Sequence, residues 1–193
     1  MNSSTKQITL SSRPKGKPVL ENFETKNIIL PELADKEISL EALYFSVDPY
    51  MRGRMNDAKS YVAPFELGKP ITGGAIAKVV KSKSINFKEN EIVTGNLPWQ
   101  QHCISTENNI VKIDTSIAPA SYYLGVLGMP GLTAYFGLLQ IGKPKNGETV
   151  VVSGAAGAVG IVVGQIAKMQ GCRVVGIAGS DEKIKLLKEE FGF

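Results

Sequence analysis

Hydrophobic and polar residues follow two different patterns along this chain, and the change comes near residue 125. Before that point, short runs rich in valine, isoleucine and aromatic residues are separated by proline, glycine, asparagine and aspartate, which is typical of a domain built from β-strands. The predicted strands are ITLSS (8–12), NIIL (27–30), EISLEALYFSV (37–47), TGGAIAKVVKS (72–82), EIVTGN (91–96) and NIVKI (109–113). We therefore expect residues 1–125 to form a β domain.

After that point, the pattern alternates strands with helices. Residues 121–142 are predicted to form helical segments around Met129-Pro130-Gly131, since proline and glycine together interrupt a continuous helix. A polar turn at 143–148 then precedes a strand TVVVSG, a helix to about Gln170, a strand CRVVGIAG and a helix from Ser180. This alternation indicates a parallel sheet with crossover helices. The predicted fold class is mixed β and α/β, with linking helices and an incomplete α/β domain over 126–193.

The α/β part contains too few elements to cover its own apolar surfaces. A two-stranded parallel sheet leaves a strand edge and much of each helix face exposed. The first helix is apolar nearly all round, with Ile161, Val162, Val163, Ile166 and Ala167, and so requires cover on more than one side. We expect either that the sequence is the front part of a longer protein or that a partner chain supplies the cover.

The amino-acid composition of the chain excludes several classes of protein. The chain has 193 residues, 43% hydrophobic and 21% charged, which is typical of a soluble globular protein. Its 22 basic and 18 acidic residues give a net charge of +4, but the lysines are scattered and form no stripe for nucleic acid. Cys103 and Cys172 are too few for a disulfide framework, and the polar start MNSSTKQITLSSRPKG lacks the pattern of a secretory leader. We expect a cytoplasmic protein.

Residues 149–167 carry no charge, and this stretch has two possible interpretations. Its length is close to the roughly 20 residues that span a bilayer, and the Gly160–Gly164 spacing occurs where membrane helices pack. Against that, Val150–Val152 favour a strand, and each of the earlier glycines weakens a helix by roughly 1 kcal/mol relative to alanine. A second strand also follows at the distance expected of a βαβ unit. We interpret the stretch as strand, turn and helix.

Glycines at 154, 157 and 160 then lie where a dinucleotide-binding fold places them, after a buried strand and at the start of a helix. One glycine makes the turn, a second lets the backbone approach a pyrophosphate, and the third lets the helix pack on the strand. Unpaired amides and the helix dipole attract the anion. The spacing departs from G-x-G-x-x-G, and a nucleoside-triphosphate P-loop is excluded because the Gly-Lys-Ser/Thr ending is missing.

The end of the second predicted strand indicates which dinucleotide binds. NAD usually meets an acidic residue there, whereas this strand ends with Ile177-Ala178-Gly179-Ser180. Ser180 and Lys183 are able to contact a 2′-phosphate as a hydroxyl donor and a point charge. In the alternative interpretation, Ser180 or Asp181 caps the next helix and Lys183 is solvated. A helix cap and a phosphate contact at these residues are compatible with each other. The acidic Asp181 argues for NAD, but NADP is the favoured cofactor.

Three segments carry a resemblance to a known family: DPYMRGRM (48–55), LGMPGLTAYFGLLQIGKPKNGETVVVSGAAGAVG (127–160) and GQIAKMQGCRVVGIAGSDEK (164–183). They resemble the zinc-independent medium-chain dehydrogenase/reductases, and among these the prostaglandin reductase, or alkenal/one oxidoreductase, group of NADPH-dependent double-bond reductases. The resemblance runs through essentially the whole chain. It implies a GroES-like β-barrel domain followed by the first half of a Rossmann domain, with the active site in the cleft between the domains. It also implies an enzyme that reduces the carbon–carbon double bond of small α,β-unsaturated ketones and aldehydes. The uncovered apolar surface of the α/β part leads us to expect a homodimer.

The resemblance also assigns site residues by position. For the cofactor these are Gly154, Gly157, Ala158, Val159 and Gly160 at the pyrophosphate, Ser180 and Lys183 at the 2′-phosphate, and Met129, Pro130 and Thr133 beside the nicotinamide. Tyr50 and Arg52 would line the substrate side, and no catalytic residue is assigned. The alternative roles are a core aromatic for Tyr50, a surface ion pair for Arg52, and either a pocket wall or a core position for Trp99.

Two rival functions remain. A zinc alcohol dehydrogenase of the same superfamily needs three protein ligands, but His102 and Cys103 are adjacent in a probable strand and point to opposite faces. Where the zinc enzymes carry Gly-His-Glu, this chain has Thr72-Gly73-Gly74, so no metal is expected. The second rival is a non-catalytic binding or structural module, because the family continues well beyond residue 193 and its cleft is incomplete here. A quinone reductase of the same superfamily is a further alternative.

Overall fold

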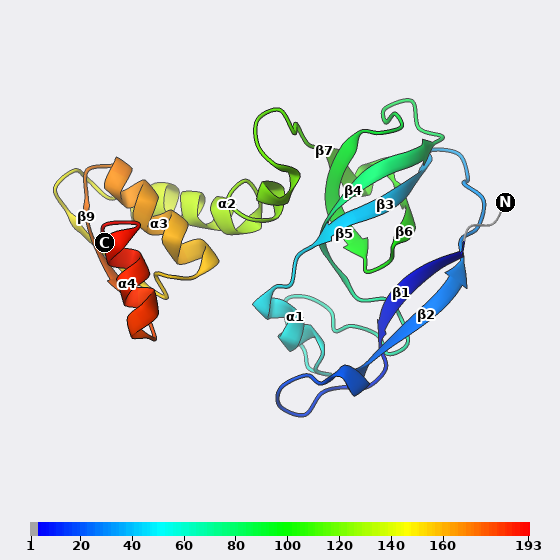
Figure 1. The fold of residues 1–193 in the computed structure, drawn as a ribbon, viewed down its shortest axis with the longest axis horizontal. Coiled ribbons are helices and arrows are strands. Elements are labelled where there is room, and N and C mark those ends of the chain that lie inside the picture. The colour runs from blue at the N-terminus through cyan, green and yellow to red at the C-terminus, as the bar shows by residue number, and fades with distance from the viewer. Residues whose placement is uncertain (1–3) are drawn as a thin grey trace. The chain divides into compact units, whose positions relative to one another are not determined.

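The computed structural model describes residues 4–193, which fall into two units divided between Ser121 and Tyr122 (Figure 1). Residues 1–3 of the polar start, and of the predicted β domain, lie outside the described residues. No helix within 4–193 is long and apolar enough to cross a membrane. The mixed β and α/β fold class is confirmed.

The first unit is built on antiparallel strands. A five-stranded sheet has the order β6-β3-β4-β5-β7, and β1 and β2 form a separate antiparallel pair. The helix and strands are β1 (Ser4–Leu10), β2 (Phe23–Ile29), β3 (Glu37–Phe45), α1 (Pro49–Arg54), β4 (Thr72–Ser82), β5 (Ile92–Pro98), β6 (His102–Thr106) and β7 (Ile110–Lys112), with 3-10 turns η1 (Leu20–Asn22) and η2 (Glu107–Asn109). The core of the sheet is formed mainly by Ile38, Leu40, Ala75, Ala77, Val79, Val93, Leu97 and Cys103.

Strand β1 begins at Ser4, earlier than the predicted start at residue 8. Three of its four buried positions hold the polar residues Thr5, Gln7 and Thr9 and only the last holds Leu10, so no alternation of apolar residues marks the strand in the sequence. Hydrogen bonds satisfy these polar side chains. The Gln100 amide donates to Gln7 Oε1 at 2.7 Å, and the His102 backbone amide donates to Thr5 Oγ1 at 2.9 Å. Burial without such partners would cost free energy.

Helix α1 is an element that the sequence analysis did not predict. Strand β3 ends at Phe45 instead of the predicted residue 47, and the chain then turns into the helix. Asp48 is in the extended N-cap conformation and Pro49 follows at the start of the helix, where a proline loses no intrahelical hydrogen bond. The Asp-Pro pair was therefore the available signal for a helix start, and the helix carries Tyr50 and Arg52.

The second unit contains the predicted strand–helix alternation. Its elements are α2 (Met129–Tyr135), a π-helix η4 (Phe136–Gly142), β8 (Thr149–Ser153), α3 (Ala158–Met169), β9 (Arg173–Ile177) and α4 (Asp181–Glu189), preceded by the 3-10 turn η3 (Ala120–Leu124). Strands β8 and β9 are parallel, with Val151 opposite Val175. Helix α2 packs along α3 (Figure 1). The uncharged stretch 149–167 is thus a strand, a turn and a helix, as predicted.

The two-stranded sheet leaves apolar side chains of the second unit in solvent. The core of this unit gathers Leu138, Val152, Ala155, Ala167, Cys172, Val174 and Leu187. On α3 the fully buried positions are Gly160, Gly164 and Ala167, while the larger Ile161 and Val163 are only half-buried. On the strands, Val151 is 62% exposed and Ile177 is 55% exposed. Each of these faces has room for a further packing partner.

Candidate functional site

The predicted glycine loop connects the end of β8 to the start of α3. Gly154 has φ +60°, a left-handed conformation that favours glycine, and its carbonyl oxygen accepts a 2.9 Å hydrogen bond from the Gly157 amide. Gly160 lies directly against the loop. A Cβ on Gly160 would overlap the Gly154 carbonyl oxygen and lie 2.8 Å from Ala155 Cα. The first turn of α3 therefore packs on the loop at a distance that only glycine allows.

Three backbone amides at the start of α3 are available to a ligand. The first intrahelical bond runs from the Ile161 amide to the Gly157 carbonyl oxygen at 3.0 Å. Within residues 4–193, no hydrogen bond uses the amides of Ala158, Val159 or Gly160, and the N-cap Gly157 has no side chain to cap them. Unpaired amides and the positive end of the helix dipole together attract an anion.

The end of β9 is connected directly to the glycine loop. The Ala155 amide donates a 3.0 Å hydrogen bond to the carbonyl oxygen of Ile177, the last residue of β9. Ser180 follows as the N-cap of α4, and its Oγ accepts a 3.4 Å hydrogen bond from the Lys183 amide. The helix-capping role considered for Ser180 is therefore present. Because Oγ accepts in this bond, the hydroxyl hydrogen stays available to donate to a phosphate.

Charges of both signs lie around Ser180. The exposed Lys183 side chain belongs to the first turn of α4, together with Asp181 and Glu182. The two carboxylates would repel a phosphate, whereas the ammonium would attract it. Within β9 and the two residues that follow it, the side chains are uncharged except for Arg173 at the opposite end of the strand. A ribose 2′-hydroxyl would thus find no carboxylate at the strand end itself.

Helix α2 carries the three residues predicted beside the nicotinamide. Pro130 is buried in its first turn, whereas Met129 and Thr133 are exposed one turn apart. The Thr133 hydroxyl donates to Met129 Sδ at 3.7 Å, so the two side chains contact each other. Because α2 packs on α3, these residues belong to the same unit as the glycine loop.

Helix α1 carries the two residues predicted on the substrate side. Tyr50 is half-buried against the cluster of Leu10, Met51, Met55, Phe65 and Ile71, so its ring has the core contacts of the alternative interpretation. Burial raises the pKa of the Tyr50 phenol above its ordinary value, and the nearby Asp48 carboxylate raises it further. Among the described residues, the Tyr50 hydroxyl has no hydrogen-bond partner.

Arg52 binds the protein's own backbone. Its Nε and Nη2 donate to the Gly16 carbonyl oxygen at 2.9 and 2.8 Å, and Nη2 also donates to the Pro14 carbonyl oxygen at 3.2 Å. Nη1 donates to Asn56 Oδ1 at 2.7 Å. These bonds engage most of the guanidinium's donors, and they differ from the surface ion pair considered as its alternative role. Arg52 thereby holds the 14–16 loop against α1.

The sequence analysis assigned no role in the site to Met51, which follows Tyr50, or to Gly73. Met51 is 3% exposed, and a Cβ on Gly73 of β4 would overlap its Cε atom. The available signal was the Gly73-Gly74 pair inside a predicted strand, because glycine in a strand interior often marks a close approach. The indole nitrogen of Trp99 lies 3.6 Å from the same Cβ position, and it is buried without a hydrogen-bond partner.

The adjacent His102 and Cys103 have different surroundings in β6. Cys103 pairs with Leu40 and is buried in the core, where desolvation raises the pKa of its thiol to about 11. His102 pairs with Glu41 and is half-buried. Across residues 4–193 no group of three or more histidine, cysteine, aspartate or glutamate side chains is placed to hold a metal ion.

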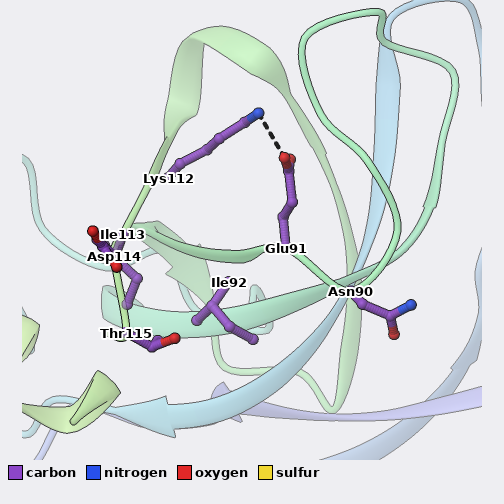
Figure 2. A pocket seen from close by; sticks show the side chains of 7 residues that line it. All are labelled: Asn90, Glu91, Ile92, Lys112, Ile113, Asp114 and Thr115. Carbon is purple, nitrogen blue, oxygen red and sulfur yellow. Dashed lines mark hydrogen bonds and ion pairs between the residues drawn. The ribbon is translucent and has the colours of Figure 1, made fainter. Parts of the chain in front are cut away.

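A cavity of about 420 Å³ lies beside the start of β5 and the end of β7. Its lining residues are Asn90, Glu91, Ile92, Lys112, Ile113, Asp114 and Thr115. Figure 2 shows Lys112 pointing to Glu91, and their ion pair measures 2.7 Å. This hydrogen bond from Lys112 lowers the pKa of Glu91. The two charges satisfy each other and none of the predicted site residues lines the cavity, so it is not the candidate site.

Comparison with known proteins finds similarity to proteins named as NADP-dependent oxidoreductases. A family described as the N-terminal domain of oxidoreductase matches residues 6–113. YfmJ of Bacillus subtilis, which carries the name of an NADP-dependent oxidoreductase, is 61% identical over 193 residues, covering 100% of this chain and 57% of that protein. The 2-alkenal reductase (NADP(+)-dependent) of Nicotiana tabacum is 46% identical over 196 residues, covering 98% of this chain and 57% of that protein.

A solved structure also matches both units of the chain. CurA from Vibrio vulnificus in complex with NADPH has a TM-score of 0.91 and 46% sequence identity, covering 97% of this chain and 56% of that one. The chain thus spans a little over half the length of the curated relatives and of the solved structure that it matches.

Proposed function

Because the chain belongs to the oxidoreductase family whose N-terminal domain spans residues 6–113, we propose that it serves NADPH-dependent reduction of carbon–carbon double bonds. The substrates are small α,β-unsaturated ketones and aldehydes. The names of the NADP-dependent 2-alkenal reductase and of the other relatives support this proposal. The activity is that of a protein of the relatives' full length that contains this chain, since the chain spans little more than half of them.

The second unit supplies groups that fit the phosphates of NADPH. The amides of Ala158, Val159 and Gly160 bind the pyrophosphate, and the absence of a side chain at Gly160 lets the helix start lie close to the loop. The Ser180 hydroxyl and the Lys183 ammonium bind the 2′-phosphate, which is the group that distinguishes NADPH from NADH. When bound, NADPH supplies the hydride for the β-carbon of the unsaturated carbonyl compound.

The remaining predicted residues position the cofactor and the substrate and exclude water. Met129, Pro130 and Thr133 face the nicotinamide end of the cofactor from α2, where the Met129–Thr133 contact provides a mostly apolar surface. Tyr50 lines the substrate side from α1, and burial raises the pKa of its phenol further above neutral pH. Arg52 acts on this side indirectly, because it holds the 14–16 loop against the same helix.

The observation that carries the proposal is the hydrogen bond from the Ala155 amide to the Ile177 carbonyl oxygen. It joins the pyrophosphate-binding amides to the segment that carries Ser180, so that one ligand with both a pyrophosphate and a 2′-phosphate is able to use both. The test is an assay of NADPH oxidation at 340 nm with 4-phenylbut-3-en-2-one, using the full-length protein. We expect the saturated ketone as product, with deuterium from labelled NADPH on the β-carbon. Reduction at the carbonyl group would refute the proposal.

A non-catalytic module is the second candidate function of the 193-residue chain itself. This candidate is favoured because the chain spans only 57% of the length of its relative YfmJ. Titration of NADPH against this chain and against the full-length protein separates the two. An enzyme predicts tight binding and turnover at full length, whereas a module predicts binding without turnover at either length. A quinone reductase would oxidise NADPH with a quinone and leave the enone unchanged.

We further propose that the full-length protein is independent of zinc, forms a homodimer and is located in the cytoplasm. Two buried free cysteines support a reducing compartment, and the exposed Val151 and Ile177 offer surface for a subunit contact. Metal analysis of the purified full-length protein should find no stoichiometric zinc, and sedimentation should give the mass of two chains. About one zinc per chain would instead place the protein with the zinc alcohol dehydrogenases.

A further inference from the structure

The side chain of Met51 occupies the space that a side chain on Gly73 would need. A Cβ on Gly73 would overlap Met51 Cε, and its next neighbours would be Trp99 Nε1 at 3.6 Å and the Ser46 carbonyl oxygen at 3.8 Å. Gly73 lies inside β4 opposite Leu97 of β5, and its φ is outside the left-handed region. Glycine at this position leaves the space that the Met51 methyl group fills, and a Cβ here would require Met51 Cε, the far end of a flexible side chain, to shift.

This contact connects α1 to the sheet. Helix α1 has 6 residues, and helices shorter than about 12 residues are marginal without tertiary contacts. Its buried anchors are Met51 at 3% and Met55 at 8% exposure, which share one cluster with Leu10, Phe65 and Ile71. Met51 reaches β4 by packing, and Arg54 at the end of α1 reaches it through a 3.5 Å hydrogen bond from Nη1 to Thr72 Oγ1. The depth at which the Met51 methyl group enters the space above Gly73 contributes to the height of the helix over the sheet.

Tyr50 precedes Met51 in the chain and follows any movement of the helix. Its ring packs on the same cluster as Met51 and Trp99, and its hydroxyl has no hydrogen-bond partner among the described residues. Packing alone holds the phenol in place. The neighbouring Arg52, by contrast, is held by hydrogen bonds to the 14–16 loop and contributes nothing to the depth of Met51.

Trp99 forms the wall of the same space. Its ring contacts Phe45 with centroids 5.8 Å apart, and its Nε1 is buried without a partner beside the Gly73 position. An unpaired buried donor is retained only where the surrounding packing compensates for it. The contact of Met51 with Gly73 beside Trp99 supplies such packing, and an added Cβ at Gly73 would displace Met51 Cε while lying at an ordinary contact distance from Trp99.

We propose that Met51 and Gly73 form a positioning pair that sets the place of Tyr50 on the substrate side. This inference rests on the enone reductase function proposed above. Neither residue touches substrate. Met51 acts through the helix that carries Tyr50, and Gly73 acts by leaving the space that Met51 fills. The pair controls use of the unsaturated substrate and leaves NADPH binding unchanged, because the glycine loop and Ser180 belong to the other unit.

The test is a double-mutant cycle in the full-length protein. Gly73→Ala should lower kcat/KM for 4-phenylbut-3-en-2-one roughly 10–100-fold, since small misplacements in an active site have effects of that size. The Kd for NADPH should stay within about twofold, as expected for distant, independent sites. Met51→Ala should give a similar loss by itself, because it removes the anchor. The double variant should lose less than the product of the two single losses, because both changes act on the same contact.

A matched control and a second readout keep the test decisive. Gly53→Ala lies in the same helix with no atom within 4 Å of the new Cβ, and it should leave both constants unchanged. Spectrophotometric titration against a Tyr50→Phe reference should show the Tyr50 pKa falling in Gly73→Ala, because the ring loses burial. If Gly73→Ala does not fold, Met51→Leu, which shortens the anchor, should show the same selective loss of enone turnover.

Several results would overturn the inference. They are unchanged enone turnover in Gly73→Ala, an equal loss of NADPH binding, and single losses that simply multiply in the double variant. If the wild-type protein reduces no enone, the proposed function fails, and the Tyr50 titration alone tests the positioning pair. A Tyr50 pKa that stays unchanged in Gly73→Ala would then refute the positioning pair independently.

Discussion

The amide nitrogen of Ala155 donates a 3.0 Å hydrogen bond to the carbonyl oxygen of Ile177. Ala155 belongs to the glycine loop after β8 and is fully buried, and Ile177 ends β9. The bond joins the first strand–helix turn of the second unit to the end of the next strand. It therefore determines that the free amides of α3 and the N-cap Ser180 of α4 lie on the same edge of the sheet.

Replacing Lys183 should separate the two nicotinamide cofactors. In the full-length protein, we expect Lys183→Ala to weaken NADPH by about 10- to 100-fold and to leave NADH nearly unchanged. A charge-assisted contact contributes roughly 1.5–3 kcal/mol, and only NADPH has the phosphate that would pair with this lysine. Lys185→Ala is the matched control, because that lysine is exposed on the same helix and pairs with Glu189 at 3.9 Å. Equal losses for both cofactors would show that Lys183 is a solvated lysine.

A methyl group at Gly160 should destabilise the second unit. The Cβ of Gly160→Ala would overlap the Gly154 carbonyl oxygen and lie 2.8 Å from Ala155 Cα, and backbone atoms move only at considerable cost. We expect a loss of about 1–3 kcal/mol in unfolding free energy, measured in urea, with weaker NADPH binding. Gly137→Ala is the control, since no atom lies within 4 Å of its Cβ. Equal stability of the two variants would contradict the close packing of α3 on the loop.

Removing the Arg52 guanidinium should release the 14–16 loop. Arg52→Ala deletes the hydrogen bonds to the Pro14 and Gly16 carbonyl oxygens, and a lysine at this position lacks the planar fork needed to replace them. We therefore expect faster trypsin cleavage after Lys15 in both Arg52→Ala and Arg52→Lys. Lys26→Ala changes a half-buried lysine of β2 that pairs with Glu24, and it serves as the control. An unchanged cleavage rate would mean that other contacts hold the loop.

Cys103 should make the stability of the first unit fall at high pH. Burial raises the pKa of its thiol from 9.0 to about 11 in the folded state. Below pH 9 both states hold the proton and stability is unaffected. Between pH 9 and 11 the unfolded state releases the proton while the folded state keeps it, so unfolding becomes more favourable.

The difference between two variants isolates this effect from other groups that titrate above pH 9. Urea unfolding at pH 8 and pH 10.5 should show a steeper loss of stability for the parent protein than for Cys103→Ala. The Cys103→Ala variant starts from a lower stability at both pH values, because it leaves a cavity in the core. Parallel losses in the two proteins would show that the Cys103 thiol does not titrate between folded and unfolded states.

Much of the second unit followed from local patterns in the sequence. The β-branched run Val150–Val152, the glycines after it and a second valine-rich strand together specify strand, turn and helix, and these signals lie within a few residues of one another. The same local reasoning located Ser180 at a helix start. The observed capping bond to the Lys183 amide spans only three residues, which is why sequence reasoning was able to anticipate it.

Strand β1 shows a first limit of such reasoning. Besides Leu10, its buried positions hold Thr5, Gln7 and Thr9, and these polar residues are compatible with burial only because partners such as Gln100 and the backbone of His102 satisfy them. Those partners lie more than 90 residues away along the chain, with separations of 93 and 97. An alternation of polar residues does not reveal such pairing by itself.

The sequence alone thus determined the order of elements in the second unit, the glycine loop and its candidate ligands, because each depends on residues close together in the chain. Only the tertiary structure decided that Arg52 holds the 14–16 loop, 36 residues away, and that Met51 fills the space at Gly73. The physical reason is that a guanidinium or a methyl group meets whichever atoms the fold brings within reach. The packing of α1 on the sheet decides which atoms come within reach, and no local sequence pattern reveals them.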